Sequence, residues 1–79
     1  MKVRIRLLGT LPSYYPGPYT TEGIEIEIPP ESTVADLVDA TGIDRRRVAI
    51  VTINGLLAKS DDRVPENAVA KLMQPVAGG

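Results

Sequence analysis

Alternating apolar and charged residues open the chain and predict strands with one buried face. Residues 2–8, KVRIRLL, place aliphatic side chains on one side and basic side chains on the other. Residues 24–28, IEIEI, repeat this scheme with isoleucines inside and glutamates outside. If the two strands pair antiparallel, Arg4 and Arg6 can lie opposite the two glutamates, and each such pair adds about 0.2–1 kcal/mol of stability.

A helical pattern follows these two strands. Ser32 or Thr33 can cap a helix of about nine residues. Asp36 stands at the capping-box distance from Thr33, and Gly42 suits a left-handed stop. The predicted buried stripe has four members at helical spacing, Val34, Leu37, Val38 and Thr41. Because so short a helix is stable only when packed, we expect it to lie on a sheet.

Residues 48–59 contain the clearest hairpin pattern. Asn54 and Gly55 suit a type I′ turn between strands at 48–53 and 56–59. Apolar side chains occupy both faces of the first of these strands, with Val48 and Ile50 opposite its other aliphatic residues. We therefore expect this strand to be covered on both sides.

The last predicted strand is residues 68–74, AVAKLMQ. In the expected register Val69 and Met73 contact the core. Pro75 lacks a backbone N–H and favours an extended residue before it, so the strand should stop there. Four to five strands and one helix predict an α+β roll with the helix across one face of the sheet. If two neighbouring strands run parallel, only the helix can supply the crossover between them.

Two segments are less regular. The loop at residues 10–22 is rich in proline and contains all three aromatic residues of the chain, Tyr14, Tyr15 and Tyr19. Its prolines argue against a regular element, and we interpret the tyrosines as a cover over one end of an aliphatic core, with a partner surface as the alternative. The run Arg45–Arg47 is interpreted as a solvated strand start, with docking to an acidic partner or a phosphate as the alternative.

Composition excludes several classes of function. The 79 residues are enough for one domain, and the chain has neither cysteine nor histidine, so disulfides, thiolate metal sites and imidazole chemistry are absent. A formal charge of −1 argues against bulk affinity for nucleic acid or anionic membranes. No apolar run is long enough to span a membrane, and the start has no secretory pattern, so we expect a cytoplasmic protein.

The chain ends in QPVAGG, and this ending carries the candidate chemistry. We expect a folded domain at residues 1–74 and a flexible arm at 75–79, which can reach about 16–18 Å when extended. Gly78 and Gly79 lack side chains, so the terminal carboxylate can pass through a channel too narrow for a Cβ. A carboxylate can attack the α-phosphate of ATP, but the chain has no Walker loop, so ATP and magnesium would belong to another protein. The domain is therefore expected to be a substrate and not a catalyst.

The chain resembles the ubiquitin-like sulfur carriers (MoaD/ThiS-like). The resemblance rests on a short first strand, the VADLVDATG helix, the VAIVTING strand and turn, and above all the closing QPVAGG. This family includes the small subunit of molybdopterin synthase and the thiamine sulfur carrier. The resemblance spans nearly the whole chain and implies a ubiquitin-like β-grasp fold, a mixed five-stranded sheet holding one helix. It also implies adenylation of the terminal glycine by a ubiquitin-activating-type enzyme, followed by conversion to a thiocarboxylate that donates sulfur in cofactor biosynthesis.

Carried onto this sequence, the resemblance makes Gly79 the site of adenylation and of the thiocarboxylate. Gly78, Ala77, Val76 and Pro75 would thread into the partner. We expect residues beside the tail exit to dock, Met73 and Val76 in particular, and Leu72 and Leu57 complete the predicted docking set. No catalytic residue, bound cofactor or metal ligand is expected in the chain itself.

The pathway stays open at this stage. Pro75 and the two residues after it are similar to the molybdopterin branch, but that branch commonly carries aromatics where this chain has Leu72, Met73 and Gln74. The sulfur-accepting partner could therefore be the molybdopterin synthase large subunit or a thiazole synthase. One alternative is a ubiquitin-like modifier conjugated to target lysines. Another is a β-grasp binding module without terminal chemistry, which could meet RNA through its arginine run.

Overall fold

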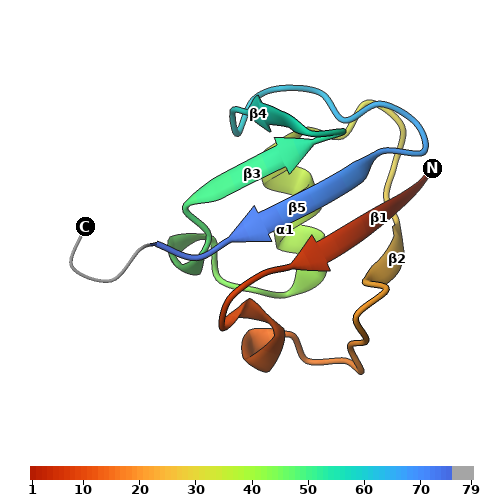
Figure 1. Ribbon diagram of the computed structural model, residues 1–79. Coiled ribbons are helices and arrows are strands. Elements are labelled where there is room, and N and C mark those ends of the chain that lie inside the picture. The colour runs from red at the N-terminus through yellow and green to blue at the C-terminus, as the bar shows by residue number, and fades with distance from the viewer. Residues whose placement is uncertain (76–79) are drawn as a thin grey trace.

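A computed structural model describes residues 1–75, which form a five-stranded sheet with one α-helix on one of its faces (Figure 1). The strand order is β2-β1-β5-β3-β4. The strands are β1 (Lys2–Leu7), β2 (Ile24–Glu27), β3 (Ile50–Ile53), β4 (Leu56–Ala58) and β5 (Val69–Met73). The central pair, β1 and β5, is parallel and every other pairing is antiparallel, which confirms the predicted mixed sheet with one helix.

The first two strands pair as the charge pattern predicts at one position but not at the other. Arg4 lies opposite Glu25, and their side chains form an ion pair at 2.8 Å. Glu27 lies opposite Lys2, and β2 begins opposite Ile5, so Arg6 lies beyond the paired residues. Arg4 therefore lies opposite a glutamate as expected, whereas Arg6 does not.

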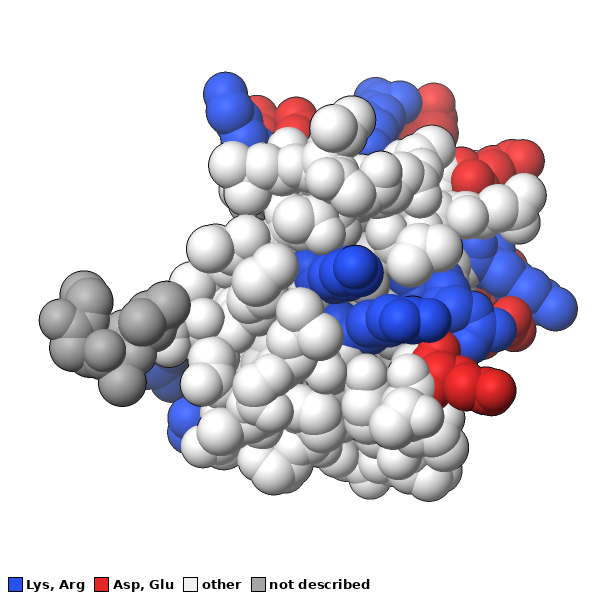
Figure 2. Space-filling view, in the orientation of Figure 1, with Lys and Arg blue, Asp and Glu red and all other residues white. Residues whose placement is uncertain are grey.

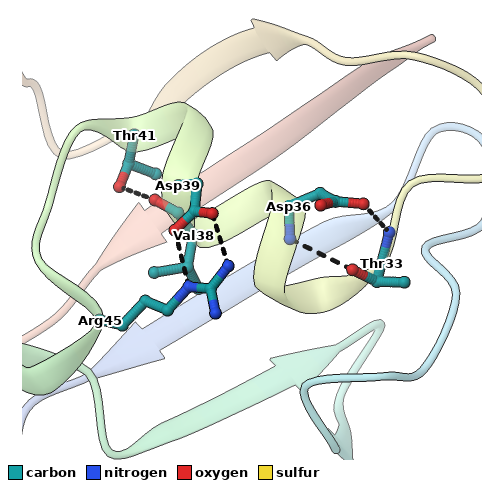
Figure 3. A network of polar contacts seen from close by, with 6 residues as sticks. All are labelled: Thr33, Asp36, Val38, Asp39, Thr41 and Arg45. Carbon is teal, nitrogen blue, oxygen red and sulfur yellow. Dashed lines mark hydrogen bonds and ion pairs between the residues drawn. The ribbon is translucent and has the colours of Figure 1, made fainter.

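The helix α1 (Val34–Thr41) begins and ends at the predicted residues. The Thr33 hydroxyl accepts a hydrogen bond from the Asp36 N–H at 3.2 Å, and the Asp36 carboxylate accepts one from the Thr33 N–H at 2.9 Å (Figure 3). Gly42 takes the left-handed conformation, with φ of 79°, and stops the helix. All four residues of the predicted stripe are buried, and α1 joins β2 to β3 across the face of the sheet.

The hairpin between β3 and β4 confirms the predicted turn. Asn54 and Gly55 both have positive φ angles, 50° and 85°, which a type I′ turn requires. Residue Ile50, however, is 40% exposed. The prediction that β3 is covered on both sides is therefore wrong, because α1 packs on one face of the sheet only.

The last strand has the opposite register from the predicted one. Ala70 and Leu72 are fully buried, whereas Val69 is 38% exposed and Met73 lies half-buried on the other face. The reason is the parallel pairing with β1, which places Ala70 beside Ile5 and Leu72 beside Leu7 on the core face. Because successive side chains of a strand point to opposite faces, Val69 and Met73 are left on the outer face.

The segment at residues 10–22 contains more regular structure than its prolines suggest. A 3-10 helix, η1 (Leu11–Tyr14), has Pro12 in its first turn, where a missing N–H costs nothing, and Leu11 is fully buried. Tyr15 and Tyr19 pack against the core as predicted, whereas Tyr14 is exposed. The Tyr19 hydroxyl accepts from the Leu7 N–H at 2.8 Å and donates to the Leu7 carbonyl at 3.2 Å. The Tyr19 hydroxyl thus satisfies the backbone N–H and carbonyl of Leu7, which lies beyond the residues of β1 that pair with β2.

Candidate functional site

The root of the C-terminal arm is held by both neighbours of β5. The Leu72 carbonyl accepts a hydrogen bond from the Leu8 N–H at 2.9 Å, and the Met73 carbonyl accepts one from the Ala49 N–H at 2.8 Å. Both bonds lie at the end of the sheet where the chain leaves it (Figure 1). The backbone is therefore fixed up to the last residue of β5.

Gln74 extends this hold one residue beyond the strand. Its side-chain oxygen accepts a hydrogen bond from the Thr10 N–H at 2.5 Å and another from the Thr10 hydroxyl. Gly9, with φ of 63°, lies directly against the Gln74 amide, and a Cβ at Gly9 would come within 2.8 Å of it. This latch between Gln74 and residues 9–10 sets the direction in which the chain leaves the domain.

Pro75 follows the latch and is exposed, as expected for a residue outside the core. The other predicted arm residues, Val76, Ala77, Gly78 and Gly79, lie outside the residues that the structure describes. The structure therefore defines where the arm starts. This starting point is anchored to two strands and to the loop after β1.

The three consecutive arginines form a second 3-10 helix, η2 (Arg45–Arg47), and not a strand, and Arg46 and Arg47 lie beside this root. Arg45 binds Asp39 of α1 through two hydrogen bonds, at 2.8 and 2.6 Å (Figure 3). Arg46 binds Asp44, whose carboxylate also caps η2 by accepting from the Arg46 N–H at 2.9 Å. These hydrogen bonds from Arg46 lower the pKa of Asp44 from 3.8 to about 2, and the side-chain hydrogen bond from Arg45 lowers the pKa of Asp39.

Arg47 is engaged differently from its two neighbours. Its guanidinium stacks over the ring of Tyr14, 3.9 Å from the centroid. Tyr14 comes from η1, so this contact joins the two 3-10 helices beside Gln74 and Pro75. Sequence reasoning set the arginine run and the tyrosine loop apart, and no local pattern signals that the two meet.

The face of the sheet away from α1 combines apolar and basic side chains. Ile50, Val69 and Met73 project from this face, and Leu57 of β4, opposite Thr52, is 77% exposed. Basic side chains gather across the middle of the face with uncharged surface on both sides (Figure 2). Arg6 and Lys71 lie directly opposite each other there, and neither forms an ion pair within residues 1–75. Like charges in this position destabilise a sheet, so the open face favours an acidic contact.

The predicted docking residues divide into two groups. Met73 and Leu57 reach the open face and are accessible to a partner. Leu72 does not reach it, because its side chain is completely buried against the core beside Leu7. Leu72 is therefore wrong as a docking residue, for the same register reason that exposes Val69. Ile50 and Lys71 were not predicted and complete the accessible set around Met73.

Two kinds of feature are absent from residues 1–75. Within that part of the chain, no group of three or more histidine, cysteine, aspartate or glutamate residues could hold a metal ion. No helix among the same residues is long and apolar enough to cross a bilayer. The candidate site within residues 1–75 therefore consists of the root of the arm, Arg47 stacked on Tyr14 beside it, and the open face of the sheet.

Comparisons with known proteins agree with this picture. The model of the ThiS family matches residues 14–79, a span that includes the terminal glycines. A search of curated proteins finds no matching relative.

Solved structures show the fold. SAMP1 from Haloferax volcanii matches with a TM-score of 0.73 and 19% identity over 100% of both chains. A second crystal structure, of H. volcanii small archaeal modifier protein 1, gives a TM-score of 0.75 at 18% identity, covering 95% of this chain and 98% of that one. A Pyrococcus furiosus protein assigned as molybdopterin converting factor subunit 1 gives a TM-score of 0.71 at 18% identity, with the same coverage. The predicted β-grasp fold is thereby confirmed.

Proposed function

Because the chain belongs to the ThiS family, we propose that it is a sulfur carrier, a protein co-substrate that bears sulfur on its C-terminal Gly79. The observation that carries this proposal is the extent of the family match, which runs to the terminal glycine. The hydrogen bonds that hold Gln74 to Thr10 also support the proposal. A body fixed up to Gln74 and followed by five residues suits an arm that enters another protein while the domain stays outside.

The proposed chemistry takes place on an adenylating enzyme of the ubiquitin-activating type. A Gly79 carboxylate oxygen attacks the α-phosphate of ATP, the bond to the β-phosphate breaks, and pyrophosphate leaves. A hydrosulfide equivalent then attacks the glycyl carbonyl and AMP leaves, so a thiocarboxylate remains. ATP and magnesium are handled by the partner, and this chain supplies the acyl group.

The thiocarboxylate would then pass its sulfur to a synthase. The two acceptors compatible with the sequence are the large subunit of molybdopterin synthase and a thiazole synthase. The Pyrococcus furiosus structural match supports the first, and the family match supports the second. We propose the role of sulfur carrier for cofactor biosynthesis without choosing between them.

The open sheet face is the proposed docking surface for these partners. Leu57→Asp and Met73→Asp should each weaken adenylation by raising the KM for this chain, because each places a charge in an apolar contact. Glu66→Lys, at an exposed position in the loop before β5, serves as a charge-changing control. Unchanged KM values in both aspartate variants would remove the sheet face from the docking surface.

A second candidate function has its own support. Two of the similar structures are of an archaeal modifier protein, and a modifier would use the same activated glycine. The two functions separate at the next step, when either sulfur or a lysine amine attacks the activated carbonyl.

Deletion of Gly79 tests the shared first step. The full chain, incubated with the adenylating enzyme of its source, should support exchange of pyrophosphate into ATP, and the deletion variant should not. Because the buried core residues run from Val3 to Leu72, circular dichroism and thermal unfolding should be the same for both proteins. Exchange that persists in the deletion variant would refute the proposed terminal chemistry.

A further inference from the structure

A hollow of about 260 Å³ lies beside the root of the arm. Three segments that are distant in sequence line it: Leu11 and Tyr14 from η1, Arg46 and Arg47 from η2, and Gln74 and Pro75 at the end of the described chain. Any protein that receives the arm must approach this hollow, because the arm starts at its wall.

Charge along η2, which lies beside the hollow, is unevenly neutralised. Arg45 and Arg46 of the same 3-10 helix are each paired with a carboxylate, Asp39 and Asp44, at 2.6 and 2.8 Å. The Arg47 guanidinium has no carboxylate within ion-pair distance among residues 1–75. Its positive charge is therefore available at the rim of the hollow.

Arg47 is also held in place before any partner arrives. The Arg47 Cζ lies over the Tyr14 ring, 3.9 Å from its centroid, and the guanidinium N–H groups make no hydrogen bond within residues 1–75. The backbone around it is fixed by the Asp44 cap of η2 and by the bond from the Ala49 N–H to the Met73 carbonyl at 2.8 Å. A planar fork of donors with restricted motion is suited to a carboxylate, which accepts two parallel hydrogen bonds.

The reach of the arm separates this site from the nucleotide. In the proposed function four residues, 76–79, carry the chain from Pro75 to the reacting Gly79, which corresponds to about 13–14 Å of extended chain. A nucleotide that reacts with Gly79 at the far end of a channel is therefore out of reach of Arg47. The anion that meets Arg47 must come from the rim of the channel.

We propose that Arg47, stacked on Tyr14, binds an aspartate or glutamate side chain of the adenylating enzyme at the mouth of the channel that receives the arm. The proposal rests on the proposed function and adds a partner contact to it. Arg47 acts as a positioning residue, because it aligns the root of the arm and does not touch the reacting carboxylate.

The test is pyrophosphate exchange driven by the adenylating enzyme purified from the protein's source, with the concentration of this chain varied. Arg47→Ala should raise the KM for the chain about tenfold and leave kcat unchanged, because the lost contact is remote from Gly79. The KM of Arg47→Lys should lie between those of Arg47→Ala and the original chain, because lysine keeps the charge but lacks the planar pair of N–H donors. Arg45→Ala removes the same charge from the same helix and should behave as the original chain.

Salt provides the second readout. The KM of the original chain should rise with ionic strength, and the rise should be smaller in Arg47→Ala than in Arg45→Ala. Thermal unfolding of each variant checks that the fold is retained.

Two results would overturn the proposal. Equal KM values for Arg47→Ala and Arg45→Ala would show that the stacked arginine makes no special contact. Arg47-dependent binding of ATP to the chain alone, measured by calorimetry, would show that its anion is a phosphate. If the original chain supports no exchange at all, the proposed function fails together with this inference, whereas exchange without an Arg47 effect refutes only the inference.

Discussion

Leu72→Ala and Met73→Ala are neighbouring truncations that should differ sharply in their effect on the free energy of unfolding. Leu72 is fully buried between β1 and β3, whereas Met73 is half-buried on the opposite face of the same strand. Complete burial of a leucine makes its truncation cost about 2–5 kcal/mol, because a cavity remains after the side chain is removed. Met73 has already left part of its surface in water, so its truncation should cost about 1 kcal/mol or less.

Urea denaturation followed by circular dichroism measures this difference. For a domain of this size the dependence on urea is about 1 kcal/mol per molar, so Leu72→Ala should lower the unfolding midpoint by about 2 M or more. The backbone bonds of residue 72 are retained in the variant, so the loss reports packing alone. A midpoint for Met73→Ala that is equal to or lower than that of Leu72→Ala would refute the register of β5 and the assignment of Met73 to the open face.

The remaining predictions concern capping, a tyrosine and acid stability. Thr33→Ala should destabilise the protein by about 1 kcal/mol, because the first turn of α1 loses its side-chain acceptor, and thermal unfolding would contradict this if the melting temperature did not fall. Tyr19→Phe should cost about 1–3 kcal/mol and accelerate hydrogen exchange at the Leu7 amide, which loses its acceptor, while unchanged exchange there would exclude the bond. Asp44 has a pKa of about 2 in the folded chain against an ordinary 3.8, so its contribution to stability is fully present above about pH 4 and is lost as the pH falls towards 2. Asp44→Asn should therefore flatten the dependence of stability on pH between about 4 and 2, and an unaltered pH profile would show that the ion pair with Arg46 has no effect on folding.

Local patterns were sufficient to predict the helix α1 and the turn between β3 and β4. The helix could be placed from Thr33, Asp36 and Gly42 because capping depends on residues a few positions apart. The Asn54-Gly55 turn could be placed for the same reason. Both features depend on residues that are close together in the sequence, so the sequence alone can reveal them.

The register of β5 could not be predicted in this way. The stretch VAKLM has apolar residues on both faces, so its own alternation does not decide which face is buried. The decision comes from pairing with β1, more than sixty residues earlier in the chain, which places Leu72 beside Leu7. This is why the sequence alone could not show that Leu72 is buried and unavailable for docking.

The proposed chemistry of the candidate site rests on the sequence, whereas the structural surroundings of the site could not be predicted from it. The ending QPVAGG predicts a reactive end, because a glycine pair before a terminal carboxylate can be recognised from the sequence alone. The latch from Thr10 to Gln74 and the stack of Arg47 on Tyr14 each join residues that only the fold brings together. Such contacts leave no local signature.

The most direct test of the central claim is the intact mass of the full-length chain after incubation with ATP, a sulfur donor and an extract of its source. The account predicts that a fraction of the protein gains the mass of one oxygen replaced by sulfur, and that the Gly79 deletion gains nothing. Full-length protein that acquires no sulfur and is instead found attached through Gly79 to lysines of other proteins would contradict the carrier role and establish a modifier.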